Sequence, residues 1–254
     1  MKVLAIQFDI AWENKAENFA RVHRLLANAK PTKDSLVVLP EMFATGFSMN
    51  AEAIAENYGG ETEQFLARTA KEFQICLIGG VAMRGKSGAV RNKALIFSPD
   101  GQLLAFYAKM RPFTLGGEAE HYTAGLRPTI FDWQGVKVSP FICYDLRFPE
   151  IFRTATAAHQ PELFVVIANW PEKRRRHWTP MLRARAIENQ AYVVAVNRIG
   201  NDPFQNYAGD SMIINPQGEI LAHGQNVESI VRATLDFASL RDYRQKYPFL
   251  ADMR

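Results

Sequence analysis

Apolar and polar positions follow two different periods along this chain. Short runs rich in β-branched and aromatic residues recur from end to end, and turn-forming residues bound them, as is typical of β-strands. We predict strands at Val3–Phe8, Leu36–Leu39, Ile75–Val81, Ala94–Ser98, Leu103–Tyr107, Val136–Ile142, Phe164–Ala168, Tyr192–Asn197, Ser211–Asn215 and Ser229–Leu235.

Helical periodicity separates several of these strands. Between Asn14 and Ala29 the apolar residues recur at three- and four-residue spacing, with polar residues opposite, which predicts an amphipathic helix. Similar patterns predict helices at Thr62–Phe73, Pro149–Ala158 and Thr179–Gln190. The turn sequences 98–101 and 215–218 predict hairpins between consecutive strands.

The order of the elements indicates a layered α/β fold. A strand–helix–strand–helix–strand series with hairpins occurs twice, so we expect two similar halves. No linker, low-complexity tract or abrupt change of composition divides the chain. We therefore expect residues 1–254 to form a single domain.

The composition is that of an ordinary soluble globular protein. The chain is 48% hydrophobic and 22% charged, and no apolar run approaches the roughly 20 residues of a membrane span. The N-terminus reads as a strand rather than a signal peptide, and two distant cysteines give neither a disulfide framework nor metal-ligand spacing. We expect a cytoplasmic protein without membrane contact, bound metal or other cofactor.

The net charge of +4 comes partly from the run Lys173–Arg176. Such a run is most often a solvated helix start or a subunit contact. It lacks the aromatic or groove-reading neighbours of a nucleic-acid module. We expect no nucleic-acid partner, and a small anionic substrate fits the charge better.

Cys143 carries the strongest chemical signal. The apolar run Ser139–Ile142 ends at this cysteine, and Tyr144-Asp145-Leu146-Arg147-Phe148-Pro149 follows at once. This order predicts a thiol on a sharp turn between a strand and a helix, where unpaired N–H groups would favour the thiolate. A buried, space-filling cysteine, as expected for Cys76, is the structural alternative.

Two ionisable residues also end predicted strands. Glu41 follows the buried strand at Leu36–Leu39, where apolar walls should raise its pKa toward the range of a general base, although glutamates also cap helices. Lys109 follows the strand at Leu103–Tyr107 and would either stabilise an oxyanion or extend to solvent. No Gly-x-Ser-x-Gly elbow, metal-spaced histidines or phosphate-binding loop offers a competing site.

The three residues in this order resemble the nitrilase superfamily of carbon–nitrogen hydrolases. The resemblance covers essentially the whole chain. Its motifs are Leu39-Pro40-Glu41, Lys109 after a strand, Cys143-Tyr-Asp-Leu-Arg-Phe-Pro149, Asn92-Lys-Ala-Leu-Ile, Asn169-Trp-Pro and Arg185-Ala-Ile-Glu-Asn189.

The resemblance implies a fold, an assembly and site roles. The fold is a four-layer αββα sandwich with two six-stranded sheets packed face to face, and the assembly is a homodimer or larger homo-oligomer with its contact near Pro149 and Thr179. By position, Glu41 is the general base, Lys109 the oxyanion stabiliser and Cys143 the nucleophile. A fourth residue, Glu118 or the neighbouring Glu120, would position Lys109.

The resemblance is closest to the ω-amidases, which hydrolyse small dicarboxylic monoamides such as 2-oxoglutaramate. Arg147 is then the candidate for the distal carboxylate, with a buried glutamate pair as its structural alternative. The expected pocket walls, which could equally be core, are Phe43, Phe113, Tyr144 and Trp170.

Two other hypotheses remain open. The chain could hydrolyse deaminated glutathione, an N-carbamoyl amino acid or a nitrile. It could also be a non-catalytic binding protein of the same fold, but that reading requires the loss of Glu41, Lys109 or Cys143, and all three are present.

Overall fold

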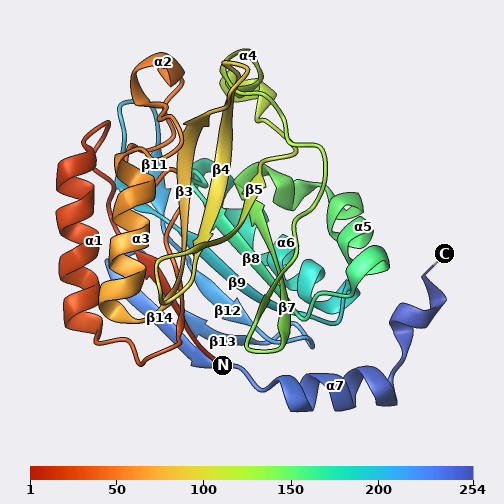
Figure 1. Ribbon diagram of the computed structural model, residues 1–254. Helices are drawn as coiled ribbons and strands as arrows, with labels where there is room; N and C mark the ends of the chain where they lie inside the picture. Colours follow the sequence, from red (N-terminus) through yellow and green to blue (C-terminus); the bar gives the residue numbers. More distant parts are fainter. Residues whose placement is uncertain (254) are drawn as a thin grey trace.

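The computed structural model describes residues 1–253, and two six-stranded β-sheets form its centre (Figure 1). The first sheet has the strand order β14-β1-β2-β3-β4-β5, and the second has β13-β12-β9-β8-β7-β6. The strands of the first sheet are β1 Lys2–Gln7, β2 Leu36–Val38, β3 Cys76–Arg84, β4 Val90–Phe97, β5 Leu103–Ala108 and β14 Ser229–Thr234. Those of the second are β6 Phe131–Trp133, β7 Val136–Ile142, β8 Leu163–Ala168, β9 Tyr192–Asn197, β12 Met212–Ile214 and β13 Ile220–His223. A separate hairpin pairs β10 Ile199–Asn201 with β11 Asn206–Ala208.

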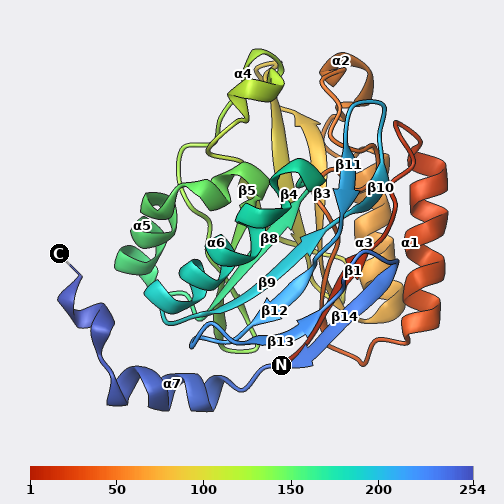
Figure 2. The same cartoon turned by 180° about the vertical axis from the view of Figure 1, so that it is seen from behind.

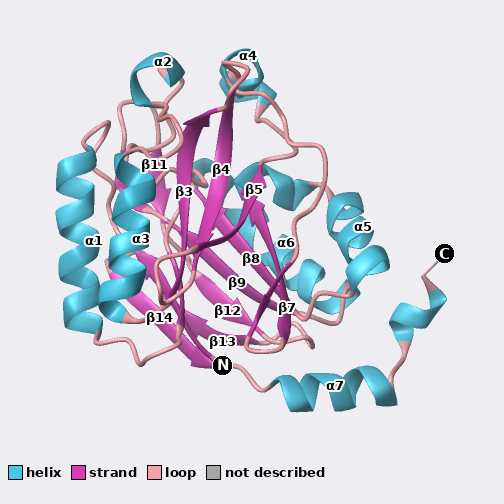
Figure 3. Cartoon of the chain, in the orientation of Figure 1, coloured by secondary structure: helices cyan, strands magenta, loops and turns pink. Residues whose placement is uncertain are grey.

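Helices cover the outer face of each sheet (Figures 1 and 3). The α-helices are α1 Lys15–Ala29, α2 Ala51–Ile54, α3 Glu61–Phe73, α4 Glu118–His121, α5 Pro149–His159, α6 Arg175–Glu188 and α7 Phe237–Lys246. Short 3-10 segments are η1 Thr114–Gly116, η2 Cys143–Arg147, η3 Glu172–Arg174 and η4 Phe249–Asp252. Viewed from behind, α7 runs outward from the body of the molecule (Figure 2).

Side-chain alternation explains the layers. In β1, Val3 and Ala5 belong to the core between the sheets, whereas Leu4 and Ile6 belong to the core beneath α1 and α3. This is the period-two pattern of a strand buried on both faces. On the other side, α5 and α6 pack apolar residues such as Phe152 against the second sheet. The predicted α/β fold, a four-layer αββα sandwich, is confirmed.

The predicted helices agree with the structure except at the start of α6. We expected this helix to begin at Thr179, but it begins at Arg175 and contains Pro180 in its interior. Contacts with Asp210 favour the earlier start: Arg175 forms an ion pair with its carboxylate, and the buried Trp178 indole donates to its carbonyl at 2.8 Å. These contacts offset the backbone hydrogen bond that a proline removes from a helix.

The two halves have the same topology, as the order of elements predicted. In the first sheet β1, β2 and β3 are parallel, with β4 and β5 antiparallel beyond β3 and β14 antiparallel beside β1. In the second sheet β7, β8 and β9 are parallel, with β12 and β13 beyond β9 and β6 beside β7. The carboxyl ends of the parallel strands in each sheet therefore lie together, which is where open α/β sheets place their ligands.

Candidate active site

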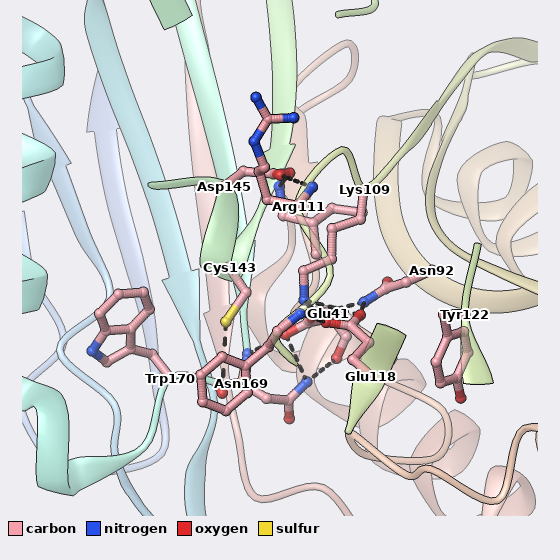
Figure 4. A network of polar contacts seen from close by, with 12 residues as sticks. Glu41, Asn92, Lys109, Arg111, Glu118, Tyr122, Cys143, Asp145, Asn169 and Trp170 are labelled. Atoms are coloured by element: carbon pink, nitrogen blue, oxygen red, sulfur yellow. Dashed lines mark hydrogen bonds and ion pairs between the residues drawn. The ribbon is translucent and has the colours of Figure 1, made fainter. Parts of the chain in front are cut away.

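The ends of four strands bring the predicted site residues together (Figure 4). Glu41 follows β2, Lys109 follows β5 and Cys143 follows β7. Asn92 joins them near the start of β4, because β4 runs antiparallel to β3 and so begins at the same edge of the sheet. Residues far apart in the sequence thus meet in a single buried cluster.

Cys143 lies on the sharp turn that the sequence predicted. It has a backbone φ of +47°, in the left-handed region that non-glycine residues rarely adopt. The turn is stabilised by Asp145, whose carboxylate accepts the backbone N–H of Ile142 at 2.9 Å and the hydroxyl of Tyr107 at 2.8 Å. The strained nucleophile position is therefore built into the fold.

Glu41 is fully buried and accepts hydrogen bonds on both carboxylate oxygens. Oε1 accepts from Lys109 Nζ at 3.0 Å and from Asn92 Nδ2 at 2.7 Å, and Oε2 accepts from the backbone N–H of Asn169 at 2.8 Å. The backbone of Gly80 lies close to the backbone of Glu41, so that a Cβ added at Gly80 would lie 2.7 Å from the Glu41 Cα. Only glycine fits at that position.

Lys109 forms ion pairs with two carboxylates. Its Nζ lies 3.0 Å from Glu41 Oε1 and 2.8 Å from Glu118 Oε2, with all three side chains buried. Burial alone would lower the pKa of Lys109, but Glu118 and Glu41 together raise it above its ordinary value. Lys109 is therefore a permanent cation in the site.

The structure distinguishes the two glutamates that the sequence left open. Glu118 is fully buried, contacts Lys109 and accepts the backbone N–H of Phe113 at 2.6 Å. Glu120, two residues on, is exposed to solvent. Only Glu118 belongs to the cluster.

Two asparagines complete the cluster, and neither was assigned a role in the sequence analysis. Asn92 donates to both Glu41 and Glu118, and Asn169 Nδ2 donates to the main-chain carbonyl of Glu41 at 2.6 Å. Asn169 directly follows β8, the strand equivalent to β2 in the other half, whereas Glu41 lies three residues beyond the end of β2. Their motifs were visible in the sequence, but a buried asparagine carries no distinctive pattern of its own.

The charge around Cys143 favours the thiol, not the thiolate. Burial raises the pKa of Cys143 well above its ordinary value, and the carboxylates of Glu41 and Glu118 raise it further against the opposing charge of Lys109. Our expectation that unpaired helix N–H groups would stabilise a thiolate is therefore wrong. The following segment is a five-residue 3-10 turn, and the two nearby carboxylates outweigh the one ammonium.

An open cavity of about 450 Å³ leads to Cys143. Of the residues predicted for the site, the cavity is lined by Lys109, Phe113, Cys143, Tyr144, Arg147 and Trp170. The additional aromatic wall residues are Trp12, Phe47, Phe204 and Tyr207. The ring of Phe47 lies 5.0 Å from Lys109 Nζ.

Phe43 is the predicted wall residue that the structure places elsewhere. It is fully buried in the core beneath α1 and α3, where its ring packs against those of Phe19 and Phe65. A phenylalanine two residues after a strand-end glutamate can face either way, and here it faces the helices.

Arg147 does not form the buried glutamate pair considered as its alternative. It is half-buried, and its guanidinium lies 4.9 Å from the ring of Trp170 and donates to His177 Nδ1 at 3.1 Å. Its positive charge faces the cavity that reaches Cys143.

Two negative findings apply to residues 1–253. No group of three or more histidine, cysteine, aspartate or glutamate side chains there is arranged to hold a metal ion. Within the same residues no helix combines the length and apolar character needed to cross a bilayer.

Comparison with known proteins places this geometry in a family. The family model for carbon-nitrogen hydrolases matches residues 2–245. An omega-amidase of Escherichia coli is 38% identical over 99% of this chain and 96% of its own length. A 2-oxoglutaramate amidase of Bacillus subtilis is 36% identical over 99% and 97%, respectively.

Solved structures agree with this assignment. The crystal structure of a CN-hydrolase superfamily protein from Xanthomonas campestris, with an arsenic adduct in its active site, superimposes with a TM-score of 0.93 at 36% identity and covers 99% of this chain and 96% of that one. Yeast Nit3, a member of branch 10 of the nitrilase superfamily, gives a TM-score of 0.86 at 28% identity over 98% and 94%. Because fold, family model and full-length relatives coincide, this chain belongs to the carbon–nitrogen hydrolase family, the nitrilase superfamily, and within it is most similar to the bacterial ω-amidases.

Proposed function

We propose that this enzyme hydrolyses the terminal carboxamide of a small dicarboxylic monoamide of the 2-oxoglutaramate type, giving the acid and ammonia through a thioester on Cys143. The observation that carries the proposal is the buried cluster of Glu41, Lys109 and Glu118 beside a cysteine that lines an open cavity. Two of the relatives named above, an omega-amidase and a 2-oxoglutaramate amidase, support this substrate class.

Glu41 is the general base of this mechanism. The raised pKa of Cys143 means that the sulfur is protonated at neutral pH, so attack requires a proton acceptor. Glu41 lies beside the thiol, and its hydrogen bonds with Lys109, Asn92 and Asn169 hold it in place. It takes the thiol proton as the sulfur bonds to the carboxamide carbon.

Lys109 stabilises the negative charge that develops on the carboxamide oxygen. It is a permanent cation, its neighbours fix its position, and it lines the cavity with Cys143. The backbone N–H of Tyr144 is a second donor from the turn after the nucleophile. Donors held in place before reaction in this way typically contribute a rate factor of about 10² to 10³ each.

Glu118 positions Lys109 rather than touching the substrate. It does not line the cavity, and its carboxylate binds both Lys109 Nζ and the N–H of Phe113. It thereby ties the ammonium to the segment that follows β5 and keeps the ammonium aimed at the reacting oxygen.

The reaction closes in two steps. Protonated Glu41 gives its proton to the nitrogen as the C–N bond breaks, so ammonia leaves and a thioester remains on Cys143. A water then loses a proton to Glu41, attacks the thioester carbon and releases the acid, while the proton returns to the sulfur. Asn169 supports a carboxamide substrate, because its buried Oδ1 has no partner among residues 1–253 and an amide N–H supplies one.

Arg147 binds the carboxylate at the far end of the substrate. A guanidinium suits a carboxylate because its N–H groups can bind both oxygens, and Arg147 lines the same cavity as Cys143. The aromatic residues Phe113, Tyr144 and Trp170 surround the carbon chain between the two ends.

Ammonia release tests this function. The substrates are 2-oxoglutaramate, deaminated glutathione, an N-carbamoyl amino acid and a simple nitrile, each assayed with the unmodified enzyme and with Cys143→Ala. We expect 2-oxoglutaramate to be hydrolysed fastest, with no turnover by the variant. Preference for another substrate would replace the substrate assignment, and turnover by the variant would remove Cys143 as the nucleophile.

We further propose that residues 1–254 form one domain that works as a homodimer in the cytoplasm. Pairing of β14 with β1 supports a single domain, because it places the first and the last strand of the chain side by side in one sheet. Exposed apolar side chains near the end of α6 and after α7, namely Ile187, Tyr247 and Phe249, support a contact there. The two unbridged cysteines, Cys76 and Cys143, are compatible with a reducing compartment.

A further inference from the structure

The basic run Lys173–Arg176 does not behave as one solvated patch. Lys173 and Arg176 are exposed, and Arg175 forms an ion pair with Asp210. Arg174 is half-buried and lines the cavity, with its guanidinium 4.7 Å from the ring of Phe113. One residue of the run therefore faces the site, although its sequence context resembles that of its neighbours.

Arg147 and Arg174 form a pair in the cavity wall. Each guanidinium lies over an aromatic ring, Arg147 over Trp170 and Arg174 over Phe113, and Arg147 also donates to His177 through Nη2. The remaining N–H groups of the two guanidiniums are available for a planar anion. Among residues 1–253, neither guanidinium has a carboxylate within ion-pair distance.

The two charges interact unfavourably in the empty site. Burial lowers the pKa of Arg147, and the nearby charge of Arg174 lowers it further. Holding two like charges side by side without a counter-ion disfavours the empty cavity. An anion bound between them would relieve this repulsion, which makes the pair selective for a charged ligand.

The other charged groups that line the cavity already have partners. Lys109 binds Glu41 and Glu118. Glu13 accepts from Ser48, and Asp202 accepts from Tyr207 and from two backbone N–H groups. The two arginines are therefore the charged groups left to recognise the substrate.

We propose that Arg174 acts with Arg147 as a two-guanidinium clamp for the substrate carboxylate remote from the carboxamide, and that Arg174 makes the enzyme select amides that carry a free carboxylate. This inference rests on the proposed amidase function and adds a specificity-determining residue to it. Each arginine supplies charge-assisted hydrogen bonds, and the aromatic rings beneath hold both guanidiniums in place.

The test compares two amides that differ only in this charge. Succinamate has a free carboxylate, and its methyl ester is the neutral analogue. We expect Arg174→Gln to lower kcat/KM for succinamate by about 10- to 100-fold, mainly through KM, and to change that for the ester by less than about twofold. Arg147→Gln should have the same effect on both substrates. For Arg174→Lys, kcat/KM for succinamate should lie between those of the unmodified enzyme and Arg174→Gln, because lysine keeps the charge but loses the planar fork.

Arg176→Gln is the matched control, since it removes the same charge from the same run at an exposed position outside the cavity. Its kcat/KM for each of the two substrates should lie within about twofold of that of the unmodified enzyme. If Arg174→Gln lowers kcat/KM equally for succinamate and for its ester, or lowers neither, the clamp is overturned.

A binding measurement separates this inference from the proposed function. Calorimetric titration with glutarate, which has carboxylates but no amide to hydrolyse, should show at least about tenfold weaker binding to Arg174→Gln than to the unmodified enzyme. If no amide is hydrolysed at all, the proposed function fails, and the glutarate titration still decides the clamp. Equal glutarate affinities in the two proteins would refute it.

Discussion

The surroundings of Cys143, the proposed nucleophile, keep its thiol protonated. Burial and the carboxylates of Glu41 and Glu118 raise the pKa of Cys143, and only Lys109 opposes them. A free thiolate would be nucleophilic toward many electrophiles, whereas this thiol reacts when a substrate lets Glu41 take its proton. Glu41 therefore has two effects of opposite sign: it disfavours the resting thiolate and enables the attack.

Replacing Glu41 separates those two effects. Glu41→Gln should lower kcat for the amide by about 10³-fold or more, because the proton acceptor is lost. It should also lower the pKa of Cys143, because the negative charge of the Glu41 carboxylate near the thiol is lost. The pH midpoint for alkylation of Cys143 by iodoacetamide should therefore shift downward, as peptide mass spectrometry can measure. An upward shift would contradict the electrostatic account of the site.

Glu118 and Glu120 form a natural matched pair of glutamates. Glu118→Gln removes a buried partner of Lys109 and should lower kcat by about 10- to 100-fold, because a misplaced oxyanion donor loses most of its effect. Glu120→Gln changes an exposed side chain and should leave kcat within about twofold. The rates are compared per folded molecule, with circular dichroism measuring the folded fraction. Equal effects of the two substitutions would remove Glu118 from the site.

At the residue scale the sequence predicted the cluster better than the pocket. Glu41, Lys109 and Cys143 each end an apolar strand, and a strand end fixes where its next side chain lies. Phe43 and Arg174 were misjudged because their direction depends on how loops pack, and neither spacing nor composition records it. The protonation of Cys143 also escaped prediction, since it depends on the net charge of three groups that meet only in the fold.

At the scale of elements, η2 and β5 are joined through a single carboxylate. Asp145 in η2 accepts from Ile142 at the end of β7, from Tyr107 in β5 and from the N–H of Arg111, two residues after Lys109. It therefore links the turn of the nucleophile to the segment that carries the oxyanion donor. Burial raises the pKa of Asp145 to about 7, against the hydrogen bonds and the charge of Lys109, which lower it.

This raised pKa predicts how stability changes with pH. The folded state binds the Asp145 proton more tightly than the unfolded state does. The contribution of Asp145 to the free energy of unfolding is therefore largest below about pH 4 and is lost as the pH rises to about 7. Relative to Asp145→Asn, the free energy of unfolding of the unmodified protein should fall by about 4 kcal/mol over that range. Urea denaturation at several pH values measures both proteins. Curves that stay parallel from pH 4 to pH 7 would show that Asp145 does not titrate there.

Every predicted strand and helix has a counterpart in the structure, but several elements were not predicted from the sequence. The predicted strands all occur, including β2 and β12 with three residues each. The strands β6, β10, β11 and β13 were not predicted, and neither was the ten-residue helix α7. The early start of α6 was missed because Trp178 and Arg175 are held by Asp210, a residue far along the chain. Such tertiary contacts outweigh local preference and leave no local signal.

At the scale of the whole molecule, the site exists only where the two equivalent halves meet. The first half supplies Glu41, Lys109 and Glu118. The second supplies Cys143 and Asn169, whose backbone N–H donates to Glu41. The packing between the sheets therefore sets the distance between Glu41 and Cys143, the proposed base and nucleophile, and we expect that activity requires both halves to be folded together.

The proposed homodimer makes a prediction at the same scale. Ile187 is 49% exposed near the end of α6, so Ile187→Glu should place a charge in the contact and give a monomer. Val227→Glu is the control, because Val227 is a similarly exposed aliphatic residue between β13 and β14. Size-exclusion chromatography with light scattering measures the masses. An unmodified protein that is already monomeric, or an Ile187→Glu variant that stays dimeric, would rule out this contact.

The thioester on Cys143 is the intermediate that defines the proposed mechanism. Trapping this intermediate tests the mechanism most directly. The enzyme is mixed with 2-oxoglutaramate, quenched in acid within the first turnover and digested, and its cysteine peptides are weighed by mass spectrometry. We predict a 2-oxoglutaryl adduct on the Cys143 peptide and none on the Cys76 peptide, with accumulation that depends on Glu41. Rapid release of ammonia with Cys143 unmodified throughout, or an adduct on another residue, would contradict the mechanism.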